Sequence, residues 1–209
     1  IKKLGVPFEY RPGQKKLVSD VYRTIMRQKL LFMQAPTGVG KTISTIFPAV
    51  KAVGEELADR IFYLTAKTIT ATVAKETFAL LEKNGYRAKT IQITAKEKLC
   101  PCDEMECNPV TCPYAKGHFD RVNDAVFDLL HRCEMIERDD ILSQADRYTV
   151  CPFELCLDTA SWCDNIICDY NYVFDPNVYL KRFFQEGIKG DYIFLIDEAH
   201  NMVERSRQM

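Results

Sequence analysis

Apolar side chains recur along this chain at two spacings, one typical of helices and one of buried strands. Residues 14–28 carry apolar positions at helical spacing with polar residues between them, which predicts a surface helix. Residues 30–34 are a short apolar run and predict a buried strand that leads into a glycine-rich loop. Residues 41–53 then predict the helix that this loop opens.

The alternation of strand and helix continues beyond this first unit. Further apolar runs predict strands at residues 61–64, 90–94, 165–168 and 192–196. A helix over residues 68–83 is predicted after the first of these strands, and it ends at the pair Asn84-Gly85. Strands that alternate with helices favour an α/β fold with a parallel sheet.

Residues 95–163 interrupt this pattern. Cys, Pro, Asp and Glu dominate up to Pro113 with little periodicity, and a helix is predicted from about His118. One face of that helix carries apolar side chains, at Val122, Val126, Leu129 and Cys133. We therefore expect a sheet domain in two parts, 1–94 and 164–209, with an inserted and mostly helical module over 95–163.

Composition restricts the class of protein without identifying it. The 209 residues are 47% hydrophobic and 27% charged, as in ordinary globular proteins. Neither a membrane-length apolar run nor a signal peptide is recognisable, which favours a cytoplasmic, reducing compartment. There the nine cysteines are best interpreted as thiols or metal ligands. The chain begins at Ile1 rather than Met, so we interpret it as an excerpt.

Net charge gives no support for binding to nucleic acid, because the formal charge is only −1. Any DNA-directed function must therefore rest on motifs.

Residues 35–42 read Ala-Pro-Thr-Gly-Val-Gly-Lys-Thr between a predicted strand and a predicted helix, the context of a phosphate-binding loop. Glycines let backbone N–H groups curl around phosphates, and the helix N-terminus favours anions. Lys41 would reach the β- and γ-phosphates, and the Thr42 hydroxyl would bind Mg²⁺. Ala35 departs from the strict pattern, which has Gly there. We assign nucleotide contacts to Pro36, Thr37, Gly38, Val39, Gly40, Lys41 and Thr42.

A second motif, Asp197-Glu198-Ala199-His200, follows the last predicted strand. Asp197 would lie at the carboxyl end of that strand, where open α/β sheets bind ligands, and would hold Mg²⁺ through water. Glu198 would polarise the attacking water as general base, so the catalytic residues are Lys41, Asp197 and Glu198. His200 is assigned to the nucleotide site with the rest of this motif.

Gln14 follows Tyr10-Arg11-Pro12-Gly13 at the start of the first helix. Its amide can donate and accept at once, so it could read adenine. A solvated helix N-terminus is the alternative interpretation.

Together these motifs resemble the iron–sulfur helicases of superfamily 2, the XPD and DinG type. The resemblance also covers the cysteine insert, Cys151-Pro152-Phe153-Glu154 and Asp169-Tyr170-Asn171-Tyr172, in the family's order. It implies a RecA-like P-loop NTPase domain with an inserted four-cysteine iron–sulfur module. It also implies ATP, Mg²⁺ and a [4Fe–4S] cluster as cofactors, and 5′-to-3′ translocation on single-stranded DNA or DNA junctions. A monomer acting on the bacterial nucleoid, in the cytoplasm and away from membranes, is expected.

The resemblance assigns the cluster to Cys100, Cys107, Cys112 and Cys151. Cys102 is the main rival, because Cys100-Pro101-Cys102 leaves little room for both thiols on one cluster. A four-thiolate site suits Zn²⁺ equally well, so zinc is the chemical alternative. The remaining thiols are interpreted as buried small apolar groups, and a second metal set is left open at Cys151, Cys156, Cys163 and Cys168.

The resemblance also suggests where DNA would bind. Thr65-Ala66-Lys67-Thr68 follows the strand at residues 61–64, where this helicase class touches the phosphate backbone. We assign DNA contacts to Thr65, Lys67, Thr68 and Tyr172, with helix capping and core packing as the alternative interpretations.

The leading hypothesis is the first motor domain of an ATP-dependent DNA helicase, a fragment inactive by itself. One alternative is a metal-stabilised DNA-binding or damage-sensing module that binds ATP without unwinding. Another is an ATPase switch unrelated to nucleic acid.

Overall fold

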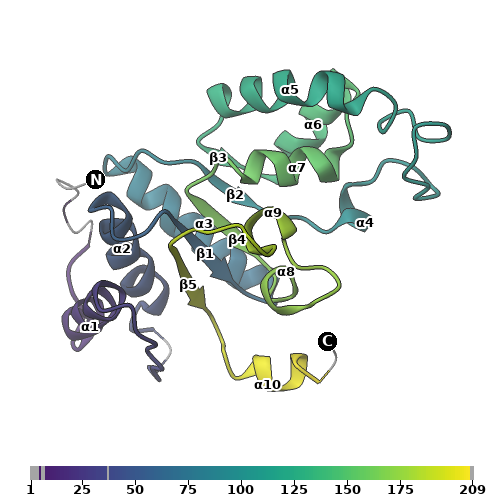
Figure 1. Cartoon of the computed structure of the whole chain (residues 1–209). Coiled ribbons are helices and arrows are strands. Elements are labelled where there is room, and N and C mark those ends of the chain that lie inside the picture. Colours follow the sequence, from purple (N-terminus) through teal and green to yellow (C-terminus); the bar gives the residue numbers. More distant parts are fainter. Residues whose placement is uncertain (1–4, 6–7, 37, 208–209) are drawn as a thin grey trace. The chain divides into compact units, whose positions relative to one another are not determined.

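The protein is an α/β structure that divides into two compact units. The computed structural model describes residues 5, 8–36 and 38–207 (Figure 1). One unit comprises Ile1–Ala88 with Ile167–Met209, and the other comprises Lys89–Ile166. The sequence prediction placed the inserted module at 95–163, a range that lies inside the second unit.

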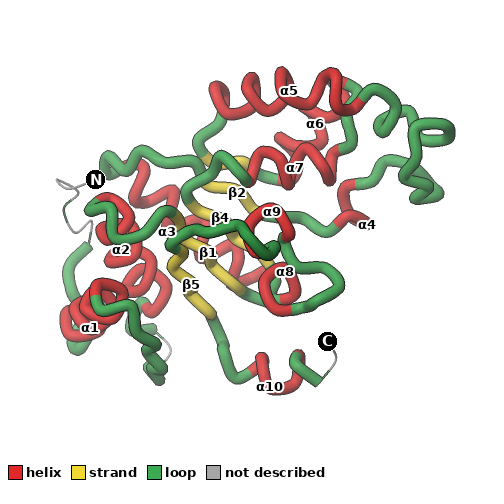
Figure 2. Tube along the Cα trace, viewed as in Figure 1, coloured by secondary structure: helices red, strands yellow, loops and turns green. Residues whose placement is uncertain are grey.

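The strands form one sheet, drawn in yellow in Figure 2. They are β1 (Arg60–Leu64), β2 (Thr90–Gln92), β3 (Met135–Ile136), β4 (Asn165–Cys168) and β5 (Tyr192–Ile196). Their order in the sheet is β3-β2-β4-β1-β5. β1 pairs in parallel with β5, and β2 pairs in parallel with β3. The predicted α/β class with a parallel sheet is therefore confirmed, although β2 is shorter than the predicted 90–94.

The first unit contains the predicted helices of the sheet domain. They are α1 (Gln14–Met26), α2 (Lys41–Gly54) and α3 (Thr68–Lys83). The unit also contains three short helices, α8 (Asn171–Phe174), α9 (Lys181–Phe184) and α10 (Asn201–Arg205). Apolar side chains of α2, α3 and β1 are removed from solvent, which supplies the main stabilising term. Phe62 of β1 lies 5.3 Å, centroid to centroid, from Phe183 of α9, so this small helix covers one face of β1.

The second unit is built on α5 (His118–Arg132), α6 (Arg138–Tyr148) and α7 (Pro152–Ala160), with the short α4 (Lys96–Leu99). The three longer helices lie against one another (Figure 1). The sequence predicted that Cys133 completes the apolar face of α5, but the helix ends before this residue. The backbone turns extended at Cys133, one residue past the end of α5, as the chain leaves for β3.

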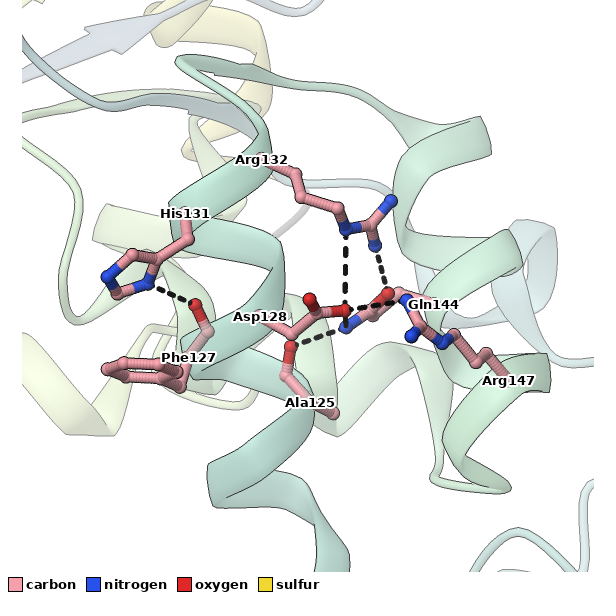
Figure 3. Close-up of polar contacts among 7 residues, drawn as sticks. All are labelled: Ala125, Phe127, Asp128, His131, Arg132, Gln144 and Arg147. Carbon is pink, nitrogen blue, oxygen red and sulfur yellow. Dashed lines mark hydrogen bonds and ion pairs between the residues drawn. The ribbon is translucent and has the colours of Figure 1, made fainter.

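Gln144 ties α6 to α5 through a polar network (Figure 3). Its side chain is fully buried, and its Nε2 donates to the carbonyl oxygen of Ala125 at 2.8 Å and to Asp128 Oδ2 at 2.9 Å. Arg132 donates to Gln144 Oε1, so both ends of the buried amide are satisfied.

The predicted strand at residues 30–34 is wrong. This run is irregular, and Leu30 and Phe32 are 87% and 88% exposed. Together with β5 it lines a groove of about 1240 Å³. A short apolar run becomes a strand only where ladder hydrogen bonds form with a neighbour. Residues 30–34 form no strand, although they line the same groove as β5, the last strand in the sheet order.

Candidate functional site

The glycine-rich loop enters α2 with the backbone that a phosphate loop requires. Gly38 has φ +87° and Gly40 has φ +76°, both in the left-handed region that favours glycine. A Cβ on Gly40 would lie 2.7 Å from Gln14 Nε2. Gly40 is the N-cap of α2, so the free N–H groups at the start of this helix follow the loop directly. Thr37 lies outside the described residues.

Lys41 connects this loop to the second motif. Its Nζ donates to the carbonyl oxygen of Ala35 at 3.3 Å and lies 4.0 Å from Glu198 Oε1. The Lys41 side chain is about one third exposed, so its ammonium group is accessible to a ligand. The structure thus brings together two of the three residues predicted to be catalytic.

The Gln14 side chain contacts the backbone of the glycine-rich loop. This side chain is buried, Oε1 accepts from the Arg11 backbone N–H at 2.9 Å, and Nε2 donates to the carbonyl oxygen of Gly40 at 3.5 Å. The guanidinium of Arg11 donates to the carbonyl oxygen of Gly38. Both ends of the Gln14 amide therefore contact backbone of its own unit, and the reading of adenine by Gln14 stays a prediction.

The Asp197-Glu198 motif follows β5 directly. The backbone N–H of Asp197 donates to the carbonyl oxygen of Leu64 at 3.0 Å, which extends the β1–β5 ladder by one step. Glu198 has φ +50°, an uncommon conformation for a residue other than Gly, Asn or Asp. Its Oε2 lies 3.5 Å from His200 Nδ1. The Glu198 carboxylate is therefore placed between Lys41 and His200.

The Tyr170 hydroxyl contacts the backbone of the Asp197-Glu198 motif. Tyr170 is fully buried, its hydroxyl donates to the carbonyl oxygen of Asp197, and the same hydroxyl lies 3.4 Å from the carbonyl oxygen of Glu198. Burial raises the pKa of Tyr170, with the Asp197 carboxylate among the further causes. Tyr170 is therefore a packing residue that supports the backbone of this motif.

Tyr63 lies beside residues of both motifs. It is in β1, is 2% exposed, and lines the groove together with Thr42 and Asp197. Burial is the main cause that raises its pKa. Sequence reasoning missed Tyr63, although its position in the strand at residues 61–64 placed it near the loop.

The oxygen donors of Thr42 and Asp197 fit a magnesium ion. Mg²⁺ in nucleotide sites prefers one or two protein oxygen ligands together with substrate phosphates, and it keeps several waters. A hydroxyl and a carboxylate that line the same groove provide that donor set.

The residues assigned to DNA differ in exposure. Thr65 is buried, and its hydroxyl bonds the Thr70 hydroxyl and accepts from the Lys67 backbone N–H at 3.3 Å. Lys67 and Thr68 are exposed at the start of α3, and Tyr172 is half-buried. α3 has Lys67 as its N-cap and no side-chain cap hydrogen bond, so the bond between Thr65 and the Lys67 N–H belongs to the turn before the helix. The role of all four residues in DNA binding stays a prediction.

Five thiols of the second unit lie near one another or near a shared neighbour. Cys102 Sγ lies 4.0 Å from Cys112 Sγ, and burial, followed by the neighbouring thiols of Cys112 and Cys100, raises the pKa of Cys102 to about 11. The Cys107 thiol is the main cause that raises the pKa of Lys96. Cys151 caps α7, and although burial raises its pKa, the backbone N–H groups of Glu154 and Phe153 oppose that rise.

These contacts are pairwise. Over residues 5, 8–36 and 38–207, no group of three or more His, Cys, Asp or Glu side chains is arranged to hold a metal ion. The donors suit iron–sulfur or zinc chemistry, but their arrangement does not close a four-thiolate site. The same finding gives no support to a second metal set at Cys151, Cys156, Cys163 and Cys168. Cys156, Cys163 and Cys168 are buried, as predicted for small apolar groups.

No described helix is both long and apolar enough to cross a membrane.

The chain resembles known proteins in sequence. Residues 70–209 match the family model described as DEAD_2. The chain is 24% identical to the general transcription and DNA repair factor IIH helicase subunit XPD/RAD3 of Saccharomyces cerevisiae, covering 97% of this chain and 30% of that protein. It is also 24% identical to a probable ATP-dependent helicase of Methanocaldococcus jannaschii, over 92% of this chain and 28% of that one.

Solved structures agree on the fold. A structure titled XPD helicase superposes with a TM-score of 0.66 at 19% identity, covering 96% of this chain and 34% of the other. A structure titled truncated XPD superposes with a TM-score of 0.62 at 17% identity, covering 93% and 55%. The chain therefore spans about a third or less of the length of the curated relatives described above.

Proposed function

Because this chain belongs to the DEAD_2 family, we propose that it is the first motor domain of an ATP-dependent DNA helicase. The observation that carries the proposal is the convergence of two distant motifs. Lys41 lies 4.0 Å from Glu198, and Thr42 and Asp197 line the same groove. The names of the relatives, which include a DNA repair helicase subunit, support the choice of DNA as partner.

Each residue has a role that its geometry permits. In the proposed reaction the N-terminus of α2 and the Lys41 ammonium bind the β- and γ-phosphates of ATP. On phosphate binding, Lys41 exchanges its contact with the Ala35 carbonyl for the ligand. Thr42 and Asp197 would hold Mg²⁺, which when bound neutralises charge on the phosphates.

Glu198 acts on the attacking water. Its carboxylate accepts a proton as the water oxygen approaches the γ-phosphorus. Tyr170 holds the backbone carbonyls of Asp197 and Glu198 and so fixes the direction of both side chains. His200, 3.5 Å from Glu198, restricts the rotamers of that carboxylate.

The cysteines would hold a [4Fe–4S] cluster in the second unit, with Cys100, Cys107, Cys112 and Cys151 as the proposed thiols. When bound, such a group would crosslink the segment between α4 and α7. Zinc on the same thiols is the alternative. Anaerobically purified protein should absorb broadly near about 400 nm if iron–sulfur is correct, because iron–thiolate charge transfer colours such proteins and zinc does not. Colourless protein with stoichiometric zinc would contradict the cluster.

DNA is the proposed partner, as a single strand contacted by Lys67 and Thr68, with 5′-to-3′ translocation carried over from the resemblance. The proposed setting is a bacterial cytoplasm.

The nucleotide site is tested by binding of a fluorescent ATP analogue in the presence of Mg²⁺. Lys41→Ala should weaken binding roughly tenfold or more, because a hydrogen bond to a charged group contributes about 1.5–3 kcal/mol. Lys83→Ala, an exposed lysine at the end of α3, is the matched control and should bind as the wild type does. Equal affinity of all three proteins would refute the phosphate-loop assignment.

A further inference from the structure

The irregular segment between α4 and α5 carries two thiols that lie close together (Figure 1). The sulfurs of Cys102 and Cys112 are 4.0 Å apart. Both side chains are partly exposed, so a small oxidant in the solvent can reach them, whereas Cys156, Cys163 and Cys168 are buried.

The backbone around Cys112 is fixed by a turn. Asn108 Oδ1 accepts from the backbone N–H groups of Val110 at 2.9 Å and Thr111 at 3.0 Å. The N–H of Cys112 donates to the carbonyl oxygen of Asn108 at 3.0 Å. Cys102, in contrast, lies in an irregular bend. An S–S bond is about 2.05 Å long, so rotation of the Cys102 side chain and a small shift of this bend would close the remaining gap of about 2 Å.

Proximity along the chain does not explain this pair. Cys107 is nearer to Cys112 in sequence than Cys102 is, and loop-closure entropy alone favours partners that are close in sequence. The Cys107 thiol is directed to its own segment, because it donates to the carbonyl oxygen of Met105 at 3.5 Å. The fold therefore brings Cys102, rather than Cys107, within 4.0 Å of Cys112.

We propose that Cys102 and Cys112 form a disulfide when the chain meets a small-molecule disulfide such as oxidised glutathione. One protein thiolate attacks a sulfur of the glutathione disulfide and expels a glutathione thiolate. The second protein thiolate then attacks the mixed disulfide and expels the other glutathione thiolate. One protein S–S bond replaces that of glutathione, and the two thiol protons pass to the glutathione thiolates. The protein pair is oxidised by two electrons, and the glutathione disulfide is reduced by two.

The disulfide would withdraw Cys112 from metal binding. Only a thiolate ligates a metal, and Cys112 belongs to the proposed four-thiolate set. Oxidation of the pair and loading of that set are therefore mutually exclusive, a consequence that rests on the proposed function. Cys102 would act as the redox partner of a metal ligand.

The test maps disulfides in the whole chain, kept in EDTA. The reduced protein is incubated with glutathione disulfide, its remaining thiols are alkylated, and it is cleaved after Lys and Glu. Cleavage after Glu104 and Glu106 separates Cys102 from Cys112, so mass spectrometry detects their disulfide as two linked peptides. We expect this link to be the main one in the native chain. It should lose that lead in urea, where proximity in sequence decides.

Two variants check the assignment. Cys102→Ser should lose the link and leave Cys112 free or joined to glutathione. Cys133→Ser is the matched control, because Cys133 is also partly exposed in the second unit and lies outside the pair, and it should form the link as the wild type does. A native chain that forms only glutathione adducts, or whose main link joins another pair, would overturn the inference. The same mixture of links with and without urea would also overturn it.

A second measurement addresses the metal. After removal of EDTA and glutathione, a competing zinc indicator compares the oxidised chain with the same chain reduced by a phosphine. The oxidised chain should bind zinc more weakly, and equal zinc binding by the two forms would contradict the withdrawal of Cys112. Absence of zinc binding by the reduced chain would instead refute the proposed four-thiolate set and leave the disulfide map standing, so the two failures are distinguishable.

Discussion

At the scale of single residues, backbone geometry and buried hydroxyls prepare the nucleotide site. Gly38 and Gly40 have left-handed φ values, and Glu198 adopts one at φ +50° without being glycine. A non-glycine residue in this region costs of order 1 kcal/mol, and Tyr170 offsets that cost by bonding the adjacent carbonyls. Strain at the proposed catalytic residue Glu198, held by a buried partner, fits a site that must keep a fixed geometry.

Gly40→Ala tests how strictly the loop needs glycine. The new Cβ would lie 2.7 Å from Gln14 Nε2 at a residue with φ +76°. Steric conflict and backbone strain should together lower stability by roughly 1–3 kcal/mol and weaken binding of the ATP analogue. Urea unfolding and analogue titration measure the two effects.

Gly85→Ala is the control for strain alone, since Gly85 has φ +95° and open space around its Cα. It should lose stability but keep nucleotide affinity. Undiminished affinity in Gly40→Ala would mean that the contact between Gln14 and the loop is unnecessary.

The motif residues could be found from the sequence because spacing along the chain defines them. Tyr170 could not, because its role depends on hydrogen bonds to residues far away in sequence. The available signal was that it follows shortly after an apolar strand run.

At the scale of elements, apolar periodicity predicted the longer helices and strands, and it failed where an element is very short or has a polar buried face. The helices α2 and α3 and the strands β4 and β5 follow apolar patterns of ordinary length, and all were predicted. The helix α6 was not predicted, because its buried face includes the polar Gln144. β3, at two residues, is too short for a pattern. The run at 30–34 looked like a strand because hydrophobicity alone does not reveal whether a neighbour pairs with it.

The polar network between α5 and α6 makes a pH-dependent contribution to stability (Figure 3). The hydrogen bond from Gln144, followed by the charges of Arg132 and Arg147, lowers the pKa of Asp128 below its ordinary value of 3.8. A carboxylate with a lowered folded-state pKa stabilises the fold above its unfolded pKa, and this contribution is lost as pH falls through the folded value.

Asp128→Asn should therefore be less stable than the wild type at pH 7, and the difference should shrink as pH falls below about 4. Denaturant unfolding of both proteins between pH 7 and pH 3 measures the difference. Asp124→Asn, on the exposed side of the same helix, should follow the wild-type profile. A difference between Asp128→Asn and the wild type that stays constant with pH would contradict a role for the carboxylate charge.

At the scale of the whole molecule, the Asp197-Glu198 motif lies at the carboxyl ends of β1 and β5. Lys41 lies 4.0 Å from the carboxylate of Glu198, the proposed general base. Two arginines near the motifs already have partners. Arg11 donates a hydrogen bond to the Gly38 carbonyl oxygen, and Arg205 forms an ion pair with Asp169 at 3.6 Å. In helicases of the resembling class a second RecA-like domain supplies arginine to the transferring phosphoryl group.

The isolated 209-residue chain should therefore bind ATP without turning it over appreciably. An arginine at the developing phosphoryl charge contributes about 10³- to 10⁵-fold to the rate in related phosphoryl-transfer enzymes, and this chain would lack that contribution. Phosphate release is measured with and without single-stranded DNA, using Glu198→Gln to identify any contaminating ATPase. Background rates in both proteins are expected. Turnover that single-stranded DNA stimulates and Glu198→Gln abolishes would mean instead that this chain supplies the positive charge itself, with Arg11 the nearest source because its guanidinium already contacts the loop.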